Sequence, residues 1–354
     1  MNMPHHWKGR GALTNPDNRF ETIHVEPDEE FDPLERSKPK TIYLHDTTKT
    51  LITYNDSPDV GFSAGINPYR GCEHGCIYCF ARPSHEYLGF SSGLDFETRI
   101  LVKLNAADIL RKELLSSKYK PQPIAFSGNT DVYQPVERKL NVTRQCLEVF
   151  AEFRNPVIMI TKNRLIERDI DLLKILSDYN AVKVFISVTS LDSTLASKME
   201  PRASCPSDRL KAIKALSQAG IPVGVIIGPV IPGLTDEELP AILKAAADAG
   251  ATTSHFVVLR LPFAVKILFE QWLESHFPDK KQKVLNRIKS VRSGKLNDPD
   301  FHTRMSGTGI YAEQIHSIFK VYSKRYKLDR PSIGLSTASF RKPSKQFMLF
   351  DEKM

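Results

Sequence analysis

Cysteine is scarce in this sequence, with five residues among 354, and three of the five fall between positions 72 and 79. No apolar run approaches the roughly 20 residues of a membrane-spanning helix. The polar start, Met1 to Trp7, is not a secretory signal peptide. These absences predict a cytoplasmic protein without a membrane partner. In such a reducing compartment, a close cysteine cluster indicates a metal site in preference to a disulfide framework.

The bulk composition is that of an ordinary globular protein, with 41% hydrophobic and 25% charged residues. The length allows one large domain with extensions, or two domains. The net charge of +8 and the isoelectric point near 9.1 favour an anionic partner, although charge alone does not identify one.

The clustered cysteines are Cys72, Cys76 and Cys79, with the spacing C-x3-C-x2-C. Three thiolates without a fourth ligand at matching spacing suit an iron–sulfur cluster that leaves one iron open. Structural zinc sites usually have four protein ligands. The alternative is a small zinc knuckle in which His74 is the fourth ligand.

From residue 61 onward, short apolar strands alternate with amphipathic helices. Strands are predicted at 62–66, 123–126, 157–160, 182–188, 223–227 and 255–259. Helices are predicted at 96–115, 142–153, 166–176, 206–220, 235–250 and 265–273. Pro206 and Gly220 mark the start and the end of the fourth helix. Thr235 and Glu238 have the spacing of a capping box at the start of the fifth helix.

Strand–helix units in series predict an α/β fold with parallel strands, because parallel neighbours need helical crossovers. Eight units would close a TIM barrel, so about six predict an open, partial (β/α)6 barrel over residues 61–276. Residues 1–60 are predicted to be an N-terminal extension, either a solvated arm or a strap across the barrel domain. The rest is predicted to be a helical addition at 277–328, which could cover the open side of the barrel, and a basic flexible tail at 329–354.

The cysteine motif has Tyr78 before its last cysteine, and this C-x3-C-x-aromatic-C pattern resembles the radical S-adenosylmethionine (SAM) superfamily. Further motifs resemble a bacterial subgroup of the spore-photoproduct-lyase-like members, often labelled DNA repair photolyases. These motifs lie at 8–12, 67–72, 81–85, 93–98, 127–135 and 199–202. The resemblance implies a [4Fe–4S] cluster on the three cysteines and cleavage of SAM to a 5′-deoxyadenosyl radical. It also implies a nucleic-acid substrate and a reductant such as flavodoxin or ferredoxin.

Several predicted strands are followed by polar residues at the rim where barrel enzymes bind their ligands. Superfamily members usually carry a Gly-Gly-Glu-like motif after the second strand, and residues 128–131 are a variant of it that a plain turn would also explain. The predicted SAM contacts are Tyr78, Gly128, Asn129, Thr130, Asp131, Ser187, Thr189, Glu200, Arg202 and Val230.

The contacts from Ser187 onward have individually predicted roles. Ser187 and Thr189 are candidates for the ribose hydroxyls. Glu200 offers a carboxylate for hydroxyls and Arg202 a guanidinium for the carboxylate of SAM, unless the two form a surface ion pair. Val230 lies in an apolar turn that suits either an adenine face or core packing.

One departure from the resemblance concerns the hydrogen donor. Spore photoproduct lyases use a cysteine near the end of the second strand, where this sequence has residues 127–131 and no cysteine. Cys146 is predicted to face the core. The remaining catalytic candidates are Cys205, which precedes a helix start that would stabilise its thiolate, and Tyr133 or Tyr87 as a radical relay. The hydrogen donor, and with it photoproduct reversal, stays open.

The last residues indicate a partner. Gln346, Leu349 and Phe350 resemble the Gln-x-x-Leu-Phe peptide with which many bacterial repair proteins bind the sliding clamp, unless these apolar side chains fold back onto the barrel. Basic segments at 280–295 and 320–345 favour DNA, or are solvated helix faces. The prediction is a radical SAM enzyme acting on nucleic acid. The rivals are radical modification of a peptide or small molecule, and a non-catalytic metal-bearing adaptor of the clamp.

Overall fold

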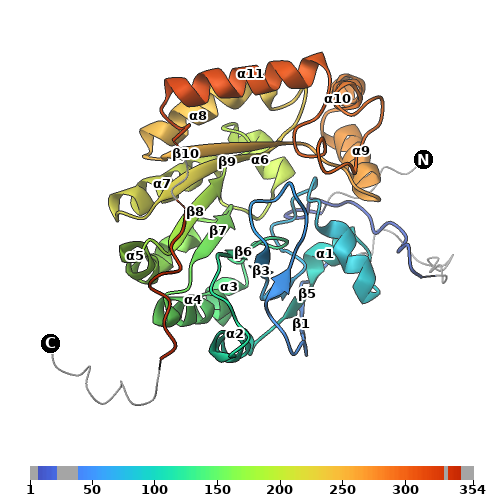
Figure 1. Cartoon of the computed structure of the whole chain (residues 1–354). Helices are drawn as coiled ribbons and strands as arrows, with labels where there is room; N and C mark the ends of the chain where they lie inside the picture. Colours follow the sequence, from blue (N-terminus) through green and yellow to red (C-terminus); the bar gives the residue numbers. More distant parts are fainter. Residues whose placement is uncertain (1–6, 22–38, 331–333, 344–354) are drawn as a thin grey trace.

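The computed structural model describes residues 7–21, 39–330 and 334–343. Its main feature is a seven-stranded sheet in the order β10-β9-β8-β7-β6-β3-β2 (Figure 1). The edge strand β2 (Thr53–Tyr54) pairs antiparallel with β3, and the other pairs are parallel. The parallel strands are β3 (Ala64–Ile66), β6 (Ile124–Phe126), β7 (Val157–Thr161), β8 (Val182–Ser187), β9 (Val223–Val230) and β10 (Thr253–Val258). Because the sheet keeps two edges, the predicted α/β fold with an open, partial barrel is confirmed.

Helices return the chain between the parallel strands and cover the outer face of the sheet (Figure 1). The longer helices are α2 (Ala106–Leu115), α4 (Val142–Phe153), α5 (Ile170–Asp178), α7 (Pro206–Gln218), α8 (Leu239–Asp248), α9 (Val265–His276), α10 (Pro278–Ser290) and α11 (Ile310–Arg325). Short helical segments are η2 (Arg82–Leu88), α1 (Leu94–Thr98), α3 (Glu137–Leu140), η3 (Arg164–Asp169), α6 (Ser193–Met199) and η4 (Asp236–Glu238). None of the helices in the described ranges has the length and apolarity needed to cross a membrane.

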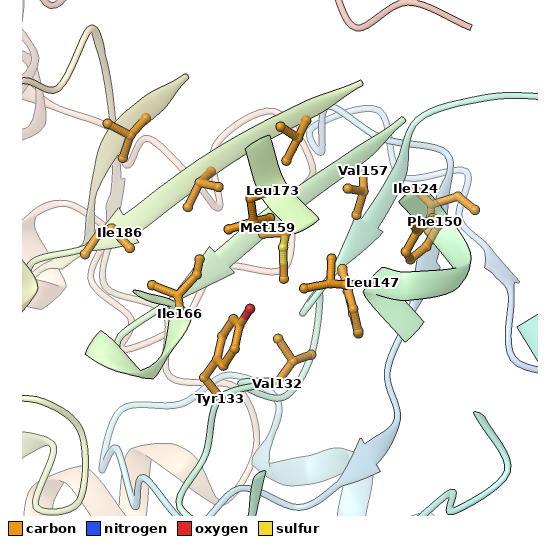
Figure 2. Packing of buried hydrophobic residues seen from close by; sticks show 14 of the residues in the cluster. Ile124, Val132, Tyr133, Leu147, Phe150, Val157, Met159, Ile166, Leu173 and Ile186 are labelled. Atoms are coloured by element: carbon orange, nitrogen blue, oxygen red, sulfur yellow. The ribbon is translucent and has the colours of Figure 1, made fainter. Parts of the chain in front are cut away.

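The main core lies between the sheet and its outer helices. β8 is buried along its whole length, and α4 presents an apolar face toward the strands. Leu147 and Phe150 of α4 belong to one cluster with Ile124, Val157 and Met159 of the neighbouring strands (Figure 2). Burial of this apolar surface fixes the strands in register, so that their carboxyl ends meet at one rim.

The predicted continuous helix at 96–115 is wrong. Residues Arg99–Val102 form a strand, β5, which separates α1 from α2. β5 lies between β1 (Ile42–His45) and β4 (Tyr69–Arg70) in a second, three-stranded sheet. Ile100 and Val102 are β-branched and are buried on one face of β5, so pairing with two strands outweighs the helical spacing of the apolar residues.

The predicted capping box at the start of the fifth helix is also wrong. The Thr235 hydroxyl accepts a hydrogen bond from the Ile231 N–H at 2.9 Å. The Glu238 carboxylate accepts hydrogen bonds from the Ser190 hydroxyl at 2.7 Å and from the Leu191 N–H at 2.6 Å. Glu238 therefore ties the loop after β8 to the start of α8 instead of capping its own helix.

The segment after β2 and the segment after α10 meet where the sheet is open. Asp59, after β2, forms an ion pair with Arg304, and the Nη2 of that arginine lies 2.6 Å from Oδ1. The Val258 N–H, at the end of β10, donates to the Met305 carbonyl at 2.9 Å. The buried Arg292 donates to carbonyls at the end of β10. Chain after α10 is thereby held over the open side of the barrel.

The last described residues lie against α4. The Arg341 N–H donates to the Phe153 carbonyl at 2.9 Å, and the Phe340 ring lies 5.8 Å from that of Tyr119. The predicted clamp-binding residues Gln346, Leu349 and Phe350 lie outside the described residues.

Candidate active site

A cavity of about 280 Å³ lies at the carboxyl ends of the parallel strands. The cysteine loop, which follows β3 and the short strand β4, forms one wall. The later strands contribute residues 127–131 after β6, residues 160–162 at the end of β7, Ser187 of β8, Ile226, Gly228 and Pro229 of β9, and Val257, Val258 and Arg260 at β10. Val60, Phe62 and Met305 cover the cavity from the segments that meet at the open side. This is the rim at which barrel enzymes bind their ligands.

The cysteine loop is pinned to its neighbours by backbone hydrogen bonds. The Cys72 N–H donates to the Phe96 carbonyl at 2.9 Å, and the Ile77 N–H donates to the Met199 carbonyl at 3.0 Å. Gly75 has a positive φ of 68°, and a Cβ there would lie 2.8 Å from a carboxylate oxygen of Glu97. The loop therefore needs glycine at this position to pack against Glu97.

A buried ion pair supports the loop from behind. Arg82 and Glu97 are both fully buried and form a salt bridge. Arg82 also donates to the carbonyl of Cys76 at 3.0 Å. Glu97 accepts from the N–H groups of Gly11 at 3.0 Å and Ala12 at 2.8 Å. The described part of the N-terminal extension therefore packs as a strap against the cysteine loop.

The three thiols fit a cluster better than they fit a single ion. Cys72, Cys76 and Cys79 all line the same cavity. Among the residues that the structure describes, no three Cys, His, Asp or Glu side chains are placed to hold one metal ion. A cluster does not require such convergence, because each thiolate binds a different iron.

His74 is engaged elsewhere and does not complete a zinc knuckle. Its Nδ1 lies 3.3 Å from a carboxylate oxygen of Asp131, and its Nε2 lies 3.2 Å from the side-chain nitrogen of Asn163. With both ring nitrogens bound, His74 has no lone pair left for a metal.

The surroundings of two of the thiols raise their pKa values. Burial raises the pKa of Cys72 well above its ordinary value, and the nearby Asp131 adds to this rise. Burial also raises the pKa of Cys76 to about 12, although the charge of Lys162 opposes it. A metal centre that binds these two thiols as thiolates would therefore release their protons.

The loop after β6 is held in a fixed shape by Asp131. Its carboxylate accepts hydrogen bonds from the Thr161 hydroxyl and the Lys162 N–H, both at 2.7 Å, in addition to its contact with His74. Burial alone would raise the pKa of Asp131, but its interaction with His74 and these hydrogen bonds lower it to about 2. Ser127 has a φ of 98°, a conformation that a non-glycine residue adopts only under constraint.

A second buried network lies behind Tyr78. The Tyr78 hydroxyl donates to Glu200, which also accepts from Thr189 at 2.6 Å and pairs with the fully enclosed Arg209. Burial would raise the pKa of Glu200, but the charges of Arg209 and Lys162 lower it to about 2. Glu200 is therefore ionised, and it positions Tyr78 on the wall of the cavity.

The predicted SAM contacts divide into two groups by location. Those that line the cavity are Tyr78, Gly128, Asn129, Thr130, Asp131 and Ser187. Those that the structure places outside its lining are Thr189, Glu200, Arg202 and Val230. Arg202 forms an ion pair with Glu73 at 2.9 Å. Glu73 also accepts a hydrogen bond from the hydroxyl of Tyr43 in β1.

The three catalytic candidates, Cys205, Tyr133 and Tyr87, are also absent from the cavity lining. The Tyr133 ring is buried in the main core, where its hydroxyl donates to Asp169 at 3.0 Å (Figure 2). Tyr87 is 73% exposed and its ring lies 4.7 Å from that of Phe20. Cys205 is exposed before α7, and Cys146 is buried in α4, as predicted.

Sequence reasoning missed Lys162, which lines the cavity directly after β7. Its ammonium lies 5.9 Å from the centre of the Tyr78 ring and has no hydrogen bond or ion pair with any described residue. Burial would lower the pKa of Lys162, but Cys76 and Glu200 raise it, so the side chain is charged. A lysine at a predicted strand end was the signal that could have identified it.

The sequence model of the Radical SAM superfamily matches residues 66–246. The chain belongs to this superfamily. An uncharacterized protein of Mycobacterium tuberculosis is 36% identical over 220 residues, which are 62% of this chain and 65% of the relative, less than two thirds of its length. An uncharacterized protein of Methanocaldococcus jannaschii is 26% identical over 222 residues, 63% of this chain and 79% of that protein.

Two further comparisons concern proteins with a described activity. The radical SAM Nalpha-GlyT isomerase of Pseudomonas phage M6 is 28% identical over 202 residues, 56% of this chain and 39% of that protein. The structure of a spore photoproduct lyase complexed with dinucleoside spore photoproduct aligns with a TM-score of 0.56. It is 16% identical and the alignment covers 80% of this chain and 79% of the lyase, so it shows the shared fold. The structural likeness agrees in fold with the superfamily that the sequence model identifies.

Proposed function

We propose that this enzyme holds a [4Fe–4S] cluster on Cys72, Cys76 and Cys79, binds SAM in the adjoining cavity and abstracts hydrogen from a nucleic acid in the cytoplasm. The observation that carries the proposal is one cavity, at the ends of the parallel strands, lined by three thiols and by the ammonium of Lys162. When bound, the cluster supplies an electron to SAM, and cleavage of the carbon–sulfur bond gives the 5′-deoxyadenosyl radical.

The cavity offers specific partners for SAM. The ammonium of Lys162 is a charged donor without a partner among the described residues, and it suits the methionyl carboxylate. The side chains of Asn129 and Ser187 line the same space and can hydrogen-bond the amino group and the ribose hydroxyls. Lys162 thereby replaces Arg202, which is bound to Glu73, as the proposed carboxylate partner.

The residues behind the wall hold these groups in place and exclude water. Asp131 joins the ends of β6 and β7 through Thr161 and Lys162. Glu200 orients Tyr78 through a hydrogen bond. The buried charge of Glu200 is balanced by its ion pair with Arg209. A rigid, dry wall of this kind retains a reactive radical at the substrate.

A nucleic-acid substrate is supported by charge and by the related proteins. The chain has a net charge of +8. One protein of the same fold is a lyase that holds a dinucleoside spore photoproduct. Among the described residues, the cysteines that line the cavity are the three proposed cluster ligands, so no further thiol is present there to return a hydrogen atom. We therefore propose hydrogen abstraction from nucleic acid, without photoproduct reversal.

Anaerobic reconstitution tests the cluster. The wild type should bind iron and sulfide and release 5′-deoxyadenosine from SAM on reduction. Cys72→Ala should abolish that release, whereas Cys205→Ala, an exposed cysteine outside the cavity, should retain it. Stoichiometric zinc without SAM cleavage would instead identify a metal-bearing adaptor.

SAM affinity tests Lys162. Lys162→Met should weaken SAM binding about tenfold or more, because a hydrogen bond to a charged group is lost. Titration calorimetry of the anaerobically reconstituted enzyme measures this change. Lys162→Arg should restore part of the affinity, and Lys211→Met, which removes an exposed lysine of α7, should leave it unchanged. Equal affinity of wild type and Lys162→Met would contradict the assignment.

Isotope transfer tests the substrate. Oligodeoxynucleotides and peptides, each fully deuterated at carbon, are incubated separately with the enzyme, SAM and a reductant. Deuterium in 5′-deoxyadenosine from the oligodeoxynucleotide supports the proposal. Deuterium from the peptide alone would move the enzyme to the rival class of peptide modification.

We further propose two partners, a flavodoxin- or ferredoxin-type reductant for the cluster and the bacterial sliding clamp for the tail. The clamp proposal is supported by the spacing of Gln346, Leu349 and Phe350. A pulldown with purified clamp compares the wild type with the variant in which all three residues are alanine. Equal clamp binding by both proteins would refute the proposed tether.

A further inference from the structure

Arg260, at the end of β10, is a cation in the cavity without an anionic partner. Its guanidinium lines the cavity, and its Nε is buried without a hydrogen-bond acceptor. Within the described residues, its one polar contact is from Nη1 to the sulfur of Met305 at 3.6 Å, and a thioether is a weak acceptor. Burial lowers the pKa of Arg260, and the neighbouring Arg304 lowers it further. A guanidinium in this environment is stabilised once an anion binds to it.

The carboxylate of Asp59, whose charge raises the pKa of Arg260 against the effect of burial, is already bound to another arginine. Asp59 contacts the guanidinium of Arg304 through both of its oxygens. Arg260 instead lies over an aromatic ring, with its guanidinium carbon 5.4 Å from the centre of the Phe80 ring. Phe80 lines the cavity and is 49% exposed, so much of the ring remains open to a ligand.

Arg260 lies three strands away from Lys162, the proposed carboxylate partner of SAM. Lys162 follows β7, whereas Arg260 follows β10, and β8 and β9 lie between these strands. Three strand spacings amount to roughly 14 Å along the sheet. Arg260 is also next to Met305, on the side where the cavity is covered by the segments from the two ends of the chain. Arg260 therefore lies where the segments from the open side reach the cavity, and Phe80, which directly follows Cys79, brings the cysteine loop to the same place.

We propose that Arg260 and Phe80 form the substrate subsite, in which Arg260 binds a backbone phosphate of a nucleic acid and Phe80 stacks on the adjoining base. The inference rests on the proposed nucleic-acid substrate. A planar guanidinium with several free N–H groups binds phosphate in two-pronged fashion. An exposed ring beside such a cation stacks on a base of any sequence, as in proteins that bind single strands. The subsite thus takes an unpaired nucleotide and presents it to the cavity.

Binding of a labelled single strand tests the subsite. Fluorescence anisotropy measures the affinity of fluorescein-labelled oligothymidylate for the anaerobically reconstituted enzyme with SAM and without reductant. Arg260→Gln should weaken binding about tenfold or more, because charged hydrogen bonds to phosphate are lost. Arg260→Lys should restore part of that loss. Phe80→Leu should weaken binding about tenfold through loss of stacking.

Two controls separate the subsite from general charge. Arg138→Gln removes an exposed arginine of α3 that is outside both the cavity lining and the basic segments, and it should leave the affinity unchanged. An oligothymidylate with neutral methylphosphonate linkages should bind the wild type as weakly as it binds Arg260→Gln. The methylphosphonate oligothymidylate should bind Phe80→Leu more weakly than it binds the wild type, because stacking does not depend on the phosphate charge.

Several outcomes would overturn the inference. Oligothymidylate binding that is independent of Arg260, in an enzyme that still cleaves SAM, removes the subsite and leaves the proposed function intact. A loss of SAM affinity in Arg260→Gln would assign the guanidinium to the cofactor. Arg260-dependent binding of an oligoglutamate peptide, without binding of oligothymidylate, would identify a carboxylate ligand. A wild type that does not cleave SAM overturns the proposed function itself.

Discussion

Two arginines, Arg82 behind the cysteine loop and Arg260 at the end of β10, show how differently the two sides of the cavity are built. Arg82 is fully buried, pairs with Glu97 and donates to the carbonyls of Cys76, Ser92 and Gly93. Arg260 also lies in the wall of the cavity, but its Nε has no acceptor.

The difference indicates that Arg82 supports the cysteine loop, whereas Arg260 is available to bind a ligand. A guanidinium that is satisfied by its own protein fixes the shape of a loop, as a cofactor ligand set requires. A guanidinium that the protein leaves without an anion is available to a ligand. The backbone of the cysteine loop is therefore fixed before any ligand binds, whereas the guanidinium at the end of β10 gains its anion only from a ligand.

The largest expected effect is on stability, and it contrasts the two arginines directly. Arg82→Met should lower the free energy of unfolding by about 3–5 kcal/mol, because it leaves Glu97 buried without its partner. Arg260→Met should change it by less than about 1 kcal/mol or stabilise the protein, because it removes a charge without a counter-anion. Urea unfolding of both variants measures the difference. Equal losses would show that Arg260 is a structural residue, against the proposed subsite.

A smaller effect is expected from the strap that supports the cysteine side. A Cβ on Gly11 would lie 1.8 Å from the Gly75 carbonyl oxygen, so Gly11→Ala must displace the strap or the loop. Overpacking of this kind lowers the free energy of unfolding by about 1–3 kcal/mol. Gly61→Ala is the matched control, because a Cβ there meets nothing within 4 Å. The free energy of unfolding in urea and the iron content after reconstitution should both be lower in Gly11→Ala. Both should stay near the wild-type values in Gly61→Ala.

The two sides also differ in how much of them could be predicted from sequence. The strand order and the cysteine wall follow from period and spacing, because six apolar segments separated by helices admit few arrangements. Residues 128–131 and Ser187 come directly after strands, and the structure places them on the cavity. The β5 segment was mistaken for helix because its pairing with β1 and β4 depends on residues distant in sequence.

Side-chain direction could not be predicted in the same way. Arg202 and Glu200 lie near the rim, but Glu73 and Arg209 are the partners that turn them away from the cavity. Those partners are set by tertiary packing. Arg260 directly follows the predicted strand at 255–259, but an arginine without a partner cannot be distinguished from a paired one until the contacts are known.

The smallest effect is a pH dependence that also belongs to the cysteine side. The pKa of Glu200 in the folded protein is about 2, below its ordinary value of 4.5. A carboxyl whose pKa is lowered by folding stabilises the protein above its unfolded pKa and loses that contribution as the pH falls toward the folded pKa. Stability supplied by Glu200 is therefore complete above about pH 5 and declines between pH 4.5 and 2, by at most about 1.4 kcal/mol per pH unit.

Glu200→Gln separates this contribution from general acid unfolding. At neutral pH the variant should be less stable than the wild type, because Arg209 is then buried without its counter-ion. As the pH falls below 4.5 the gap in the free energy of unfolding should narrow, because the wild type loses the same ion pair by protonation. Asp208→Asn breaks an exposed pair with Lys211 and should leave a small gap at every pH. Urea unfolding from pH 7 to pH 3 measures both gaps, and a constant gap for Glu200→Gln would mean that folding does not lower the pKa of Glu200.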